Sequence, residues 1–457
     1  MIAESFAAVG AGWLRGSVLS ELFPLLLTPV LLAGMWYRNA LSPMMRRGYA
    51  VLLGVVIVAF GALCLARARR NVIDPPRWDV QAFWLFGKVA VVGDDFYRPE
   101  SFHAVADSLR AAGEPVSTAG DFNRELLDVG FPYPPMTMLL FAPLGLLGLH
   151  AAALVWYLVI IASTAAVIGV LWHRLFEPPG MWELAFTTAM VLTLRATYST
   201  YAFGQTGFLL LLCLLLFWRD RNRISGGAYL ALAIVVKPIA AFFLGWTVLD
   251  RRWRSVLATV LVLAGLAAVT ALAFGTEVFT SFITSNSVSR MPHSYYSSNI
   301  NQSLLATWVR ATHYDFSLGS PLRQPAFIAM ILAIAGVTFG MEMKLGRSRS
   351  ALGLALGVPA ALLVYPQTLE HYSVLLLLPL LFIWTRLREL DVSPVVAVTF
   401  LTLEYALVRY QGGRLDFFAV LLCWVTLLVI SIRAVRHSSM IAKPGWMQPS
   451  GAAIGSR

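Results

Sequence analysis

An aspartate that follows a proline-rich turn is well placed for acid–base chemistry. Asp79 comes after Asp74-Pro75-Pro76-Arg77-Trp78 and directly precedes the apolar stretch 80–92. This position suits the N-cap of a helix. It also suits a base held at a membrane surface, where ionisable groups are costly and often functional. The two roles are compatible, because a cap fixes the carboxylate in place. We therefore interpret Asp79 as a candidate catalytic base.

The stretch 80–92 predicts a helix beside this carboxylate. Its apolar residues recur at helical spacing, which predicts an amphipathic helix lying along the membrane interface. Trp78 and Trp84 would then lie at headgroup level. The residues that carry the spacing are Ala82, Phe83, Phe86, Val89 and Ala90.

Further polar residues stand beside apolar runs along the rest of the chain. Each is weak evidence alone, since a lone histidine next to an apolar run is more often a hydrogen-bonded interface residue than a catalyst. Together they become stronger evidence if all of them lie at the same face of the membrane. The candidates are Tyr133, Arg195, Gln205, Lys237, Asn301, Gln302, Glu370 and His371.

Metal and nucleotide chemistry have little support in the sequence. Asp94 and Asp95 are a pair that could hold a divalent cation, but adjacent loop acids are usually only solvated. No CxxC or HExxH spacing, GxGxxG loop or Walker loop is present. We therefore expect no metal site and no cofactor.

The composition indicates the class of fold that must hold these residues in place. Of 457 residues, 58% are hydrophobic and only 13% charged, against roughly a quarter charged in soluble domains. This excludes a soluble enzyme, a disordered chain and a disulfide scaffold, and predicts an all-α polytopic membrane protein. The net charge of +11 does not indicate a nucleic-acid partner, because the basic residues are scattered between apolar runs.

A membrane crossing needs ~20 residues, and many apolar runs of this chain approach that length. They predict a bundle of about 11–13 transmembrane helices. Two long connections, 68–135 and 275–322, interrupt them and are expected to be partly ordered. The runs are 21–37, 49–67, 149–172, 182–200, 206–218, 226–248, 255–274, 324–341, 351–365, 372–385, 393–408 and 417–432.

Short basic loops orient this bundle, because cytoplasmic loops carry the excess of Lys and Arg. The long connections 68–135 and 275–322 then fall outside, together with the short loops 201–205 and 366–371. Arg67, Arg69 and Arg70 are exceptions at the outer end of 49–67. The loops that we place inside contain Arg38, Arg46 and Arg47; Arg219, Arg221 and Arg223; Arg251, Arg252 and Arg254; Lys344, Arg347 and Arg349; Arg386 and Arg388; and Arg433 and Arg436.

The run 226–248 conflicts with this topology, because three arginines flank it at each end. A re-entrant hairpin with Lys237-Pro238 near its tip removes the conflict, since proline disfavours helix at the preceding residue. An ordinary kinked crossing that tolerates the charge violation is the alternative. The run 21–37 either crosses the membrane or lies at its surface.

The order and spacing of several motifs resemble glycosyltransferase family 87, membrane enzymes of the GT-C class. The resemblance covers roughly residues 70–385. Its motifs are Asp79 with Gly93 and Tyr97; Tyr133-Pro134-Pro135 with Phe141, Pro143 and Leu144; Gly204-Gln205; Lys237-Pro238 before Arg251-Arg252-Trp253-Arg254; Asn301-Gln302-Ser303; and Glu370-His371.

The chain departs from the family at its last motif, which commonly reads Ser-Pro-x-Ser-Trp-x-His-His. Tyr365 stands at the first Ser position, Leu369 at the Trp position and Tyr372 at the second His position. These changes bear on the contacts to acceptor and phosphate, and on the choice of sugar. The resemblance also divides the chain into an extra N-terminal segment 1–48, a GT-C catalytic domain 49–432 and a cytoplasmic tail 433–457 that we expect to be disordered.

The resemblance implies transfer of a sugar, expected to be mannose, from a polyprenyl-phosphate donor with inversion, giving an α-1,2 linkage. The acceptor would be a glycolipid or an envelope polysaccharide, and membrane lipids would surround the enzyme. The site would face the extracytoplasmic side of a bacterial inner membrane, in loops that carry short interfacial helices. His371, then Arg195 and Lys237, would contact the leaving phosphate.

The remaining polar candidates would contact the substrates. Gln205, Tyr133, Asn301 and Gln302 would bond sugar hydroxyls, and Glu370 belongs to the same substrate-binding set. Two alternatives remain open from the sequence. One is a transporter or lipid flippase, although no internal repeat typical of transporters is evident. The other is a related GT-C enzyme that transfers arabinose or glucose.

Overall fold

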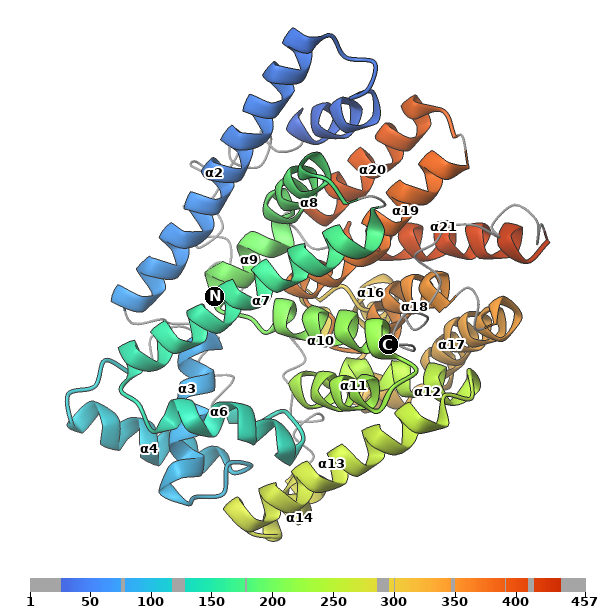
Figure 1. Ribbon diagram of the computed structural model, residues 1–457. Coiled ribbons are helices and arrows are strands. Elements are labelled where there is room, and N and C mark those ends of the chain that lie inside the picture. Colours follow the sequence, from blue (N-terminus) through green and yellow to red (C-terminus); the bar gives the residue numbers. More distant parts are fainter. Residues whose placement is uncertain are drawn as a thin grey trace, which may run out of the picture.

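The computed structural model describes residues 26–74, 79–116, 128–176, 179–285, 296–299, 301–346, 350–390, 392–409 and 415–436. Within these ranges the regular elements are helices, apart from one isolated β-bridge between Asn301 and Leu369 (Figure 1). The prediction of an all-α polytopic membrane protein is confirmed. Residues 1–25 of the N-terminal segment and 437–457 of the tail lie outside the described residues.

Six described helical segments are long and apolar enough to cross a membrane, or seven if one bent pair counts as a span. Their exposed residues are largely aliphatic, as a lipid-facing surface requires. These segments are α2 Pro43–Ile73, α7 Leu149–Leu175, α13 Trp253–Phe274, α17 Pro325–Leu345, the segment Glu370–Leu387 and α21 Asp416–Arg436. The fifth consists of η6 Glu370–Leu376 and most of α19 Leu377–Glu389.

Shorter helices complete the bundle. The predicted run 182–200 is broken at Leu194, and the chain bends by 119° between α9 and α10, where Gly204 adopts a left-handed conformation at φ 74°. The shorter helices are Leu26–Trp36, α8 Met181–Thr193, α9 Arg195–Phe203, α10 Gly207–Asp220, α11 Ile224–Val236, η2 Pro238–Ala241, α12 Phe242–Leu249, α18 Ser350–Val364 and α20 Pro394–Arg409.

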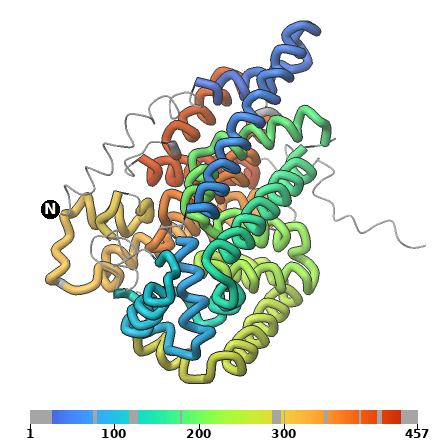
Figure 2. Tube along the Cα trace, turned by 90° about the vertical axis from the view of Figure 1, so that its left-hand side faces the viewer, coloured from blue at the N-terminus to red at the C-terminus, as the bar shows by residue number. Residues whose placement is uncertain are grey.

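Both long connections contain helices of their own, as expected. The first holds α3 Asp79–Val92 and α4 Pro99–Ala111, and leads into η1 Pro135–Thr137 and α6 Met138–Gly145. The second holds α14 Glu277–Ser285, α16 Leu304–Thr312, η3 Phe316–Leu318 and η4 Pro321–Arg323. In Figure 2 the segments of α4 and α14 lie at the same, lower end of the molecule.

The prediction that α3 is an amphipathic interface helix is wrong. Ten of its residues are buried, on every side of the helix, because α6 packs against it through facing glycines. A Cβ on Gly87 would lie 2.3 Å from the carbonyl oxygen of Phe141. Trp84 is fully buried and donates to the Leu147 carbonyl over 3.0 Å, so its ring packs inside the protein and does not face lipid headgroups. Trp78 lies outside the described residues.

The structure supports the hairpin interpretation of 226–248. Helix α11 ends at Val236, Lys237 is extended, and the chain returns through η2 and α12. The two ends then meet, because Arg252 donates to the Asn222 side chain and Ser255 Oγ donates to the Arg221 carbonyl over 2.6 Å. Both arginine clusters therefore lie on one side of the bundle.

This side, which we call the arginine end, gathers further helix termini. Arg174 at the end of α7 lies near Arg219 and Asp220 at the end of α10. Glu342 near the end of α17 lies beside Arg252. The long connections and the loops 201–205 and 366–371 lie at the opposite end, where Gln302 N donates to the Thr368 carbonyl over 2.6 Å.

The hairpin makes a prediction about sidedness. Cysteines introduced at the exposed positions Arg223 and Arg254 should both escape an impermeant thiol reagent applied to intact cells. A cysteine at exposed Asp94 should react, because it belongs to the opposite end. The parent protein is the blank, since Cys64, Cys213 and Cys423 are buried. Labelling of positions 223 and 254 from different sides would show that the segment crosses.

Candidate functional site

The candidate base Asp79 lies at the first turn of α3, against the loop between α9 and α10. It accepts a hydrogen bond from the side chain of Gln205. Gly204 makes this approach possible, because a Cβ at that position would lie 1.9 Å from Val80 Cγ2. The left-handed Gly204 thus brings Gln205 to the start of α3. Asp79 and Gln205, which were predicted separately, come from segments more than a hundred residues apart in sequence.

Lys237 supplies a positive charge beside this carboxylate. It is buried at the break between α11 and η2, and its charge acts on Asp79. Its Nζ donates to the Tyr372 hydroxyl and lies 4.2 Å from the centre of the Tyr372 ring. Lys237 has an extended backbone because it precedes Pro238, and it therefore lies outside helix α11.

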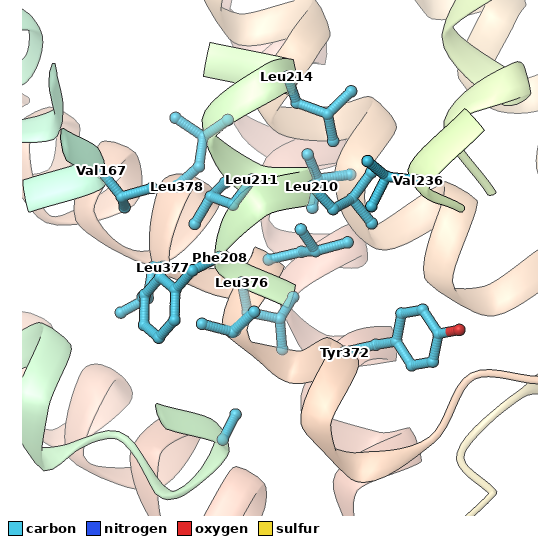
Figure 3. Close-up of a cluster of buried hydrophobic side chains, with 14 of the residues drawn as sticks. Val167, Phe208, Leu210, Leu211, Leu214, Val236, Tyr372, Leu376, Leu377 and Leu378 are labelled. Atoms are coloured by element: carbon cyan, nitrogen blue, oxygen red, sulfur yellow. The ribbon is translucent and has the colours of Figure 1, made fainter. Parts of the chain in front are cut away.

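His371 and Tyr372 complete the same site from η6. The two rings stack with centroids 4.8 Å apart. Figure 3 shows Tyr372 at the edge of an apolar cluster, with its hydroxyl directed away from the leucines of α10 and α19. This cluster holds η6 against α10, since a Cβ on Gly207 would lie 2.7 Å from Val374 and 3.4 Å from the His371 carbonyl.

Tyr133 forms another wall. Its ring centre lies 5.6 Å from Lys237 Nζ, and its carbonyl accepts from the Tyr97 hydroxyl over 2.8 Å. The following turn is tied to the hairpin, because Thr137 Oγ1 donates to the Val235 carbonyl over 2.7 Å. Five of the predicted residues therefore lie together: Asp79, Tyr133, Gln205, Lys237 and His371.

Several polar atoms around this site are buried and lack a hydrogen-bond partner among the described residues. They include Gln205 Oε1, Thr206 Oγ1 and His371 Nε2. An unsatisfied buried polar group costs about 1–3 kcal/mol. Because such groups gather beside Asp79 and Lys237, the site is suited to a polar ligand that would satisfy them.

Electrostatics suit Asp79 to proton transfer. Burial raises its pKa to about 6, while the hydrogen bond from Gln205 and the charge of Lys237 act in the opposite direction. Helix α3 is not among the candidate membrane spans. A carboxylate with such a pKa is ionised at neutral pH, yet basic enough to accept a proton near the operating pH.

The remaining predicted residues form a second layer. Gln302 is fully buried, donates to Asp416 and accepts from Ser373 Oγ over 3.1 Å. Asn301 is also fully buried, and its side chain bonds the Pro366 carbonyl and the Ser303 amide. These contacts favour a positioning role for both residues, which hold the 366–371 loop, over the predicted contact to sugar.

Arg195 and Glu370 lie in the same layer, on the α9 side. Glu370 accepts from Ser199 Oγ over 2.8 Å. Arg195 lies 5.3 Å from the ring centre of Tyr198, and Arg67 lies 5.9 Å from the same ring. Arg67, an exception to the charge rule, thus packs against α9. The structure does not place Arg195 in direct contact with Asp79 or Lys237.

Sequence reasoning gave no role to Tyr97 or Asp416, and treated Tyr372 only as a departure from a motif. Tyr372 could have been found by that substitution, since it takes a position next to His371. Asp416 is an acid directly ahead of an apolar run, which is a usable signal of a functional or buried carboxylate. Tyr97 was named only as part of the family motif that begins with Asp79.

The two acids considered for a cation behave differently. Asp95 accepts from the Tyr97 amide over 2.9 Å and from Ser281 Oγ over 2.8 Å, and lies 3.3 Å from Arg98. Asp94 is exposed. Within the described ranges, no group of three or more His, Cys, Asp or Glu side chains is arranged to hold a metal ion.

The site combines the partly buried carboxylate of Asp79 with the buried Lys237 at one end of a multi-span bundle. The model of glycosyltransferase family 87 matches residues 131–366, just over half of the 457 residues. The chain belongs to this family and is a membrane glycosyltransferase. This finding favours the enzyme over the transporter alternative. No curated protein and no solved structure matches the chain.

The pKa of Asp79 makes a prediction about pH. If Asp79 is the base, kcat/KM should be lost as the pH falls through about 6, because the ionised form is the active one. Gln205→Leu removes a hydrogen bond that favours the ionised form. The acid limb should then move up by roughly one to two pH units, since such a bond contributes ~1.5–3 kcal/mol and one unit is ~1.4 kcal/mol.

The matched control is Gln324→Leu, because Gln324 donates to Tyr314 in the second long connection. Its pH profile should coincide with that of the parent protein. An acid limb that does not move in Gln205→Leu would mean that a group other than Asp79 titrates.

Proposed function

We propose that this glycosyltransferase moves a sugar, mannose in the first instance, from a polyprenyl-phosphate donor to a glycolipid or envelope polysaccharide. The observation that carries the proposal is that the charge of Lys237 acts on Asp79, beside buried polar atoms that lack partners among the described residues. A carboxylate and a cation in one site match the two needs of the reaction. One accepts the proton of the acceptor, and the other stabilises the leaving phosphate.

Asp79 acts as the base in this proposal. The acceptor hydroxyl attacks the anomeric carbon as the bond to phosphate breaks, through an oxocarbenium-like state. The proton passes to Asp79, and attack from the face opposite the phosphate inverts the configuration. A β-linked donor then gives an α-linked product, and we assign the α-1,2 linkage on the family resemblance. General-base catalysis of this kind contributes roughly 10²–10⁴-fold.

Lys237 and His371 act on the leaving group. The ammonium of Lys237 is fixed by Tyr372, and His371 has a buried nitrogen without a partner among the described residues. Preorganised charges and donors at a developing anion usually supply the largest part of catalysis. In this proposal Gln205 and Tyr133 contact the sugar, while Arg195 and Glu370 support the site from the α9 side.

A lipid-linked donor fits the position of the site. The lipid tail can lie against the apolar helices while phosphate and sugar reach the end of the bundle that carries both long connections. The arginine end would face the cytoplasm under the positive-inside rule. The site then opens on the extracytoplasmic side of a bacterial inner membrane, and the glycosyl-phosphate bond provides the energy without a nucleotide or other cofactor.

The direct test is incubation of purified protein with labelled polyprenyl-phosphate-mannose and a panel of envelope glycolipids. In this assay Asp79→Asn should lower turnover by roughly 10²-fold or more, because an amide cannot accept the proton. The melting temperature and donor binding should stay near those of the parent. Asp94→Asn, at an exposed acid of the same connection, is the control and should remain active. Normal turnover by Asp79→Asn would refute its role as the base.

A second variant tests the leaving-group contact. His371→Ala should lower turnover roughly ten- to a hundredfold, because a hydrogen bond to a charged group contributes ~1.5–3 kcal/mol. The loss should shrink with donors whose phosphate leaves more easily. His173→Ala is the matched control, since His173 is exposed at the arginine end. A His371→Ala enzyme with parental kinetics would leave His371 a structural role.

A further inference from the structure

A polar pocket opens between the two long connections, apart from the site around Asp79. Its volume is about 520 Å³. One wall comes from the segment between α3 and α4, the first residues of α4 and Asp128, and the other comes from α14. Asp95 joins the walls, since it accepts from Ser281 on α14 and from the Tyr97 amide. The lining residues are Asp95, Tyr97, Arg98, Pro99, Glu100, Asp128, Ser281, Thr284 and Ser285.

The lining restricts the chemistry of a ligand. Three carboxylates face a single arginine, so a phosphate or another anion is disfavoured. A cation would have to displace existing contacts, because Asp95 already bonds Tyr97 and Ser281 and lies 3.3 Å from Arg98. Hydroxyls and carboxylates together suit a neutral ligand rich in hydroxyl groups, since each carboxylate can accept from neighbouring hydroxyls of a sugar ring.

The pocket is linked to the candidate active site by one side chain. Tyr97 lines the pocket, and its hydroxyl donates to the Tyr133 carbonyl over 2.8 Å. The Tyr133 ring in turn lies 5.6 Å from Lys237 Nζ. Tyr97 and Tyr133 thus lie between the pocket and the candidate active site.

We propose that this pocket is a subsite for the glycan portion of the acceptor, which lies beyond the sugar that receives the transfer. The inference rests on the proposed function, because it takes the acceptor to be a carbohydrate. The volume suits about two or three sugar rings, since pockets for drug-sized ligands hold roughly 300–1,000 Å³. The enzyme then prefers an acceptor that already carries several sugars to one that carries a single sugar.

The test fills the pocket without touching Asp79, Lys237 or His371. Thr284 is exposed on α14 and lines the pocket, so Thr284→Trp occupies part of its volume. The parent should have a lower KM for lipid acceptors with three or four sugars than for one with a single sugar. In Thr284→Trp this difference should fall by about tenfold, and the KM for the donor should match that of the parent.

Direct binding gives a readout that needs no turnover. Manno-, gluco- and arabino-oligosaccharides of three units are titrated into the purified protein, and also into Asp79→Asn. At least one should bind to both proteins, and its Kd should rise about tenfold in Thr284→Trp. Ile283→Trp is the matched control, because Ile283 is 77% exposed on the same helix and does not line the pocket.

The outcomes separate the two proposals. Suppose Asp79→Asn abolishes transfer, but Thr284→Trp changes neither the acceptor preference nor oligosaccharide binding. The subsite is then refuted while the proposed function stands. An equal effect of Ile283→Trp would also refute the subsite, because the change would then not depend on the pocket. Binding without any sugar transfer by the parent would support the pocket and contradict the proposed function.

Discussion

The site is built around Asp79 and Lys237, which lie close enough for the charge of the lysine to act on the carboxylate. Each residue is costly to bury alone, and each lies where the backbone changes direction: Asp79 at the start of α3, Lys237 where α11 ends. Opposite charges in a low-dielectric setting reduce that cost and hold the two segments in register. The same pair supplies a base and a cation to the proposed reaction. A structural need and a chemical need are therefore met by the same two residues.

The re-entrant hairpin explains how a lysine reaches this position inside a membrane protein. A straight crossing would place Lys237 on an unbroken helix, with all its backbone groups bonded internally. The break before Pro238 lets the chain turn back, and the protein around it covers the irregular backbone, as lipid cannot. Asn222 and Arg252 close the base of the hairpin. Protein covers the break, because Thr137 Oγ1 donates to the Val235 carbonyl and Lys237 Nζ donates to the Tyr372 hydroxyl.

The two long connections act together, although they are far apart in sequence. Asp95 bonds Ser281 across them, and the 301–303 segment pairs with the 366–371 loop. These contacts place Tyr97, Tyr133 and His371 around a common site. The helices in the membrane serve mainly as a frame with an apolar exterior. Specificity for the acceptor would then lie in the two long connections, because their residues do not have to face lipid.

The class of fold follows from the sequence alone, because apolar runs in lipid have almost no alternative to helices. The sequence also indicated Asp79, Lys237, Gln205, Tyr133 and His371, since polar groups beside apolar runs are expensive and stand out. It failed for α3, where helical spacing suggested an interface but glycines at 87 and 145 allow α6 to bury the helix. It could not separate Asn301 and Gln302, which hold a loop, from residues that face the site. Periodicity reports which residues are apolar, whereas the partner on each face is set by contacts between distant segments, and only the tertiary structure decides those.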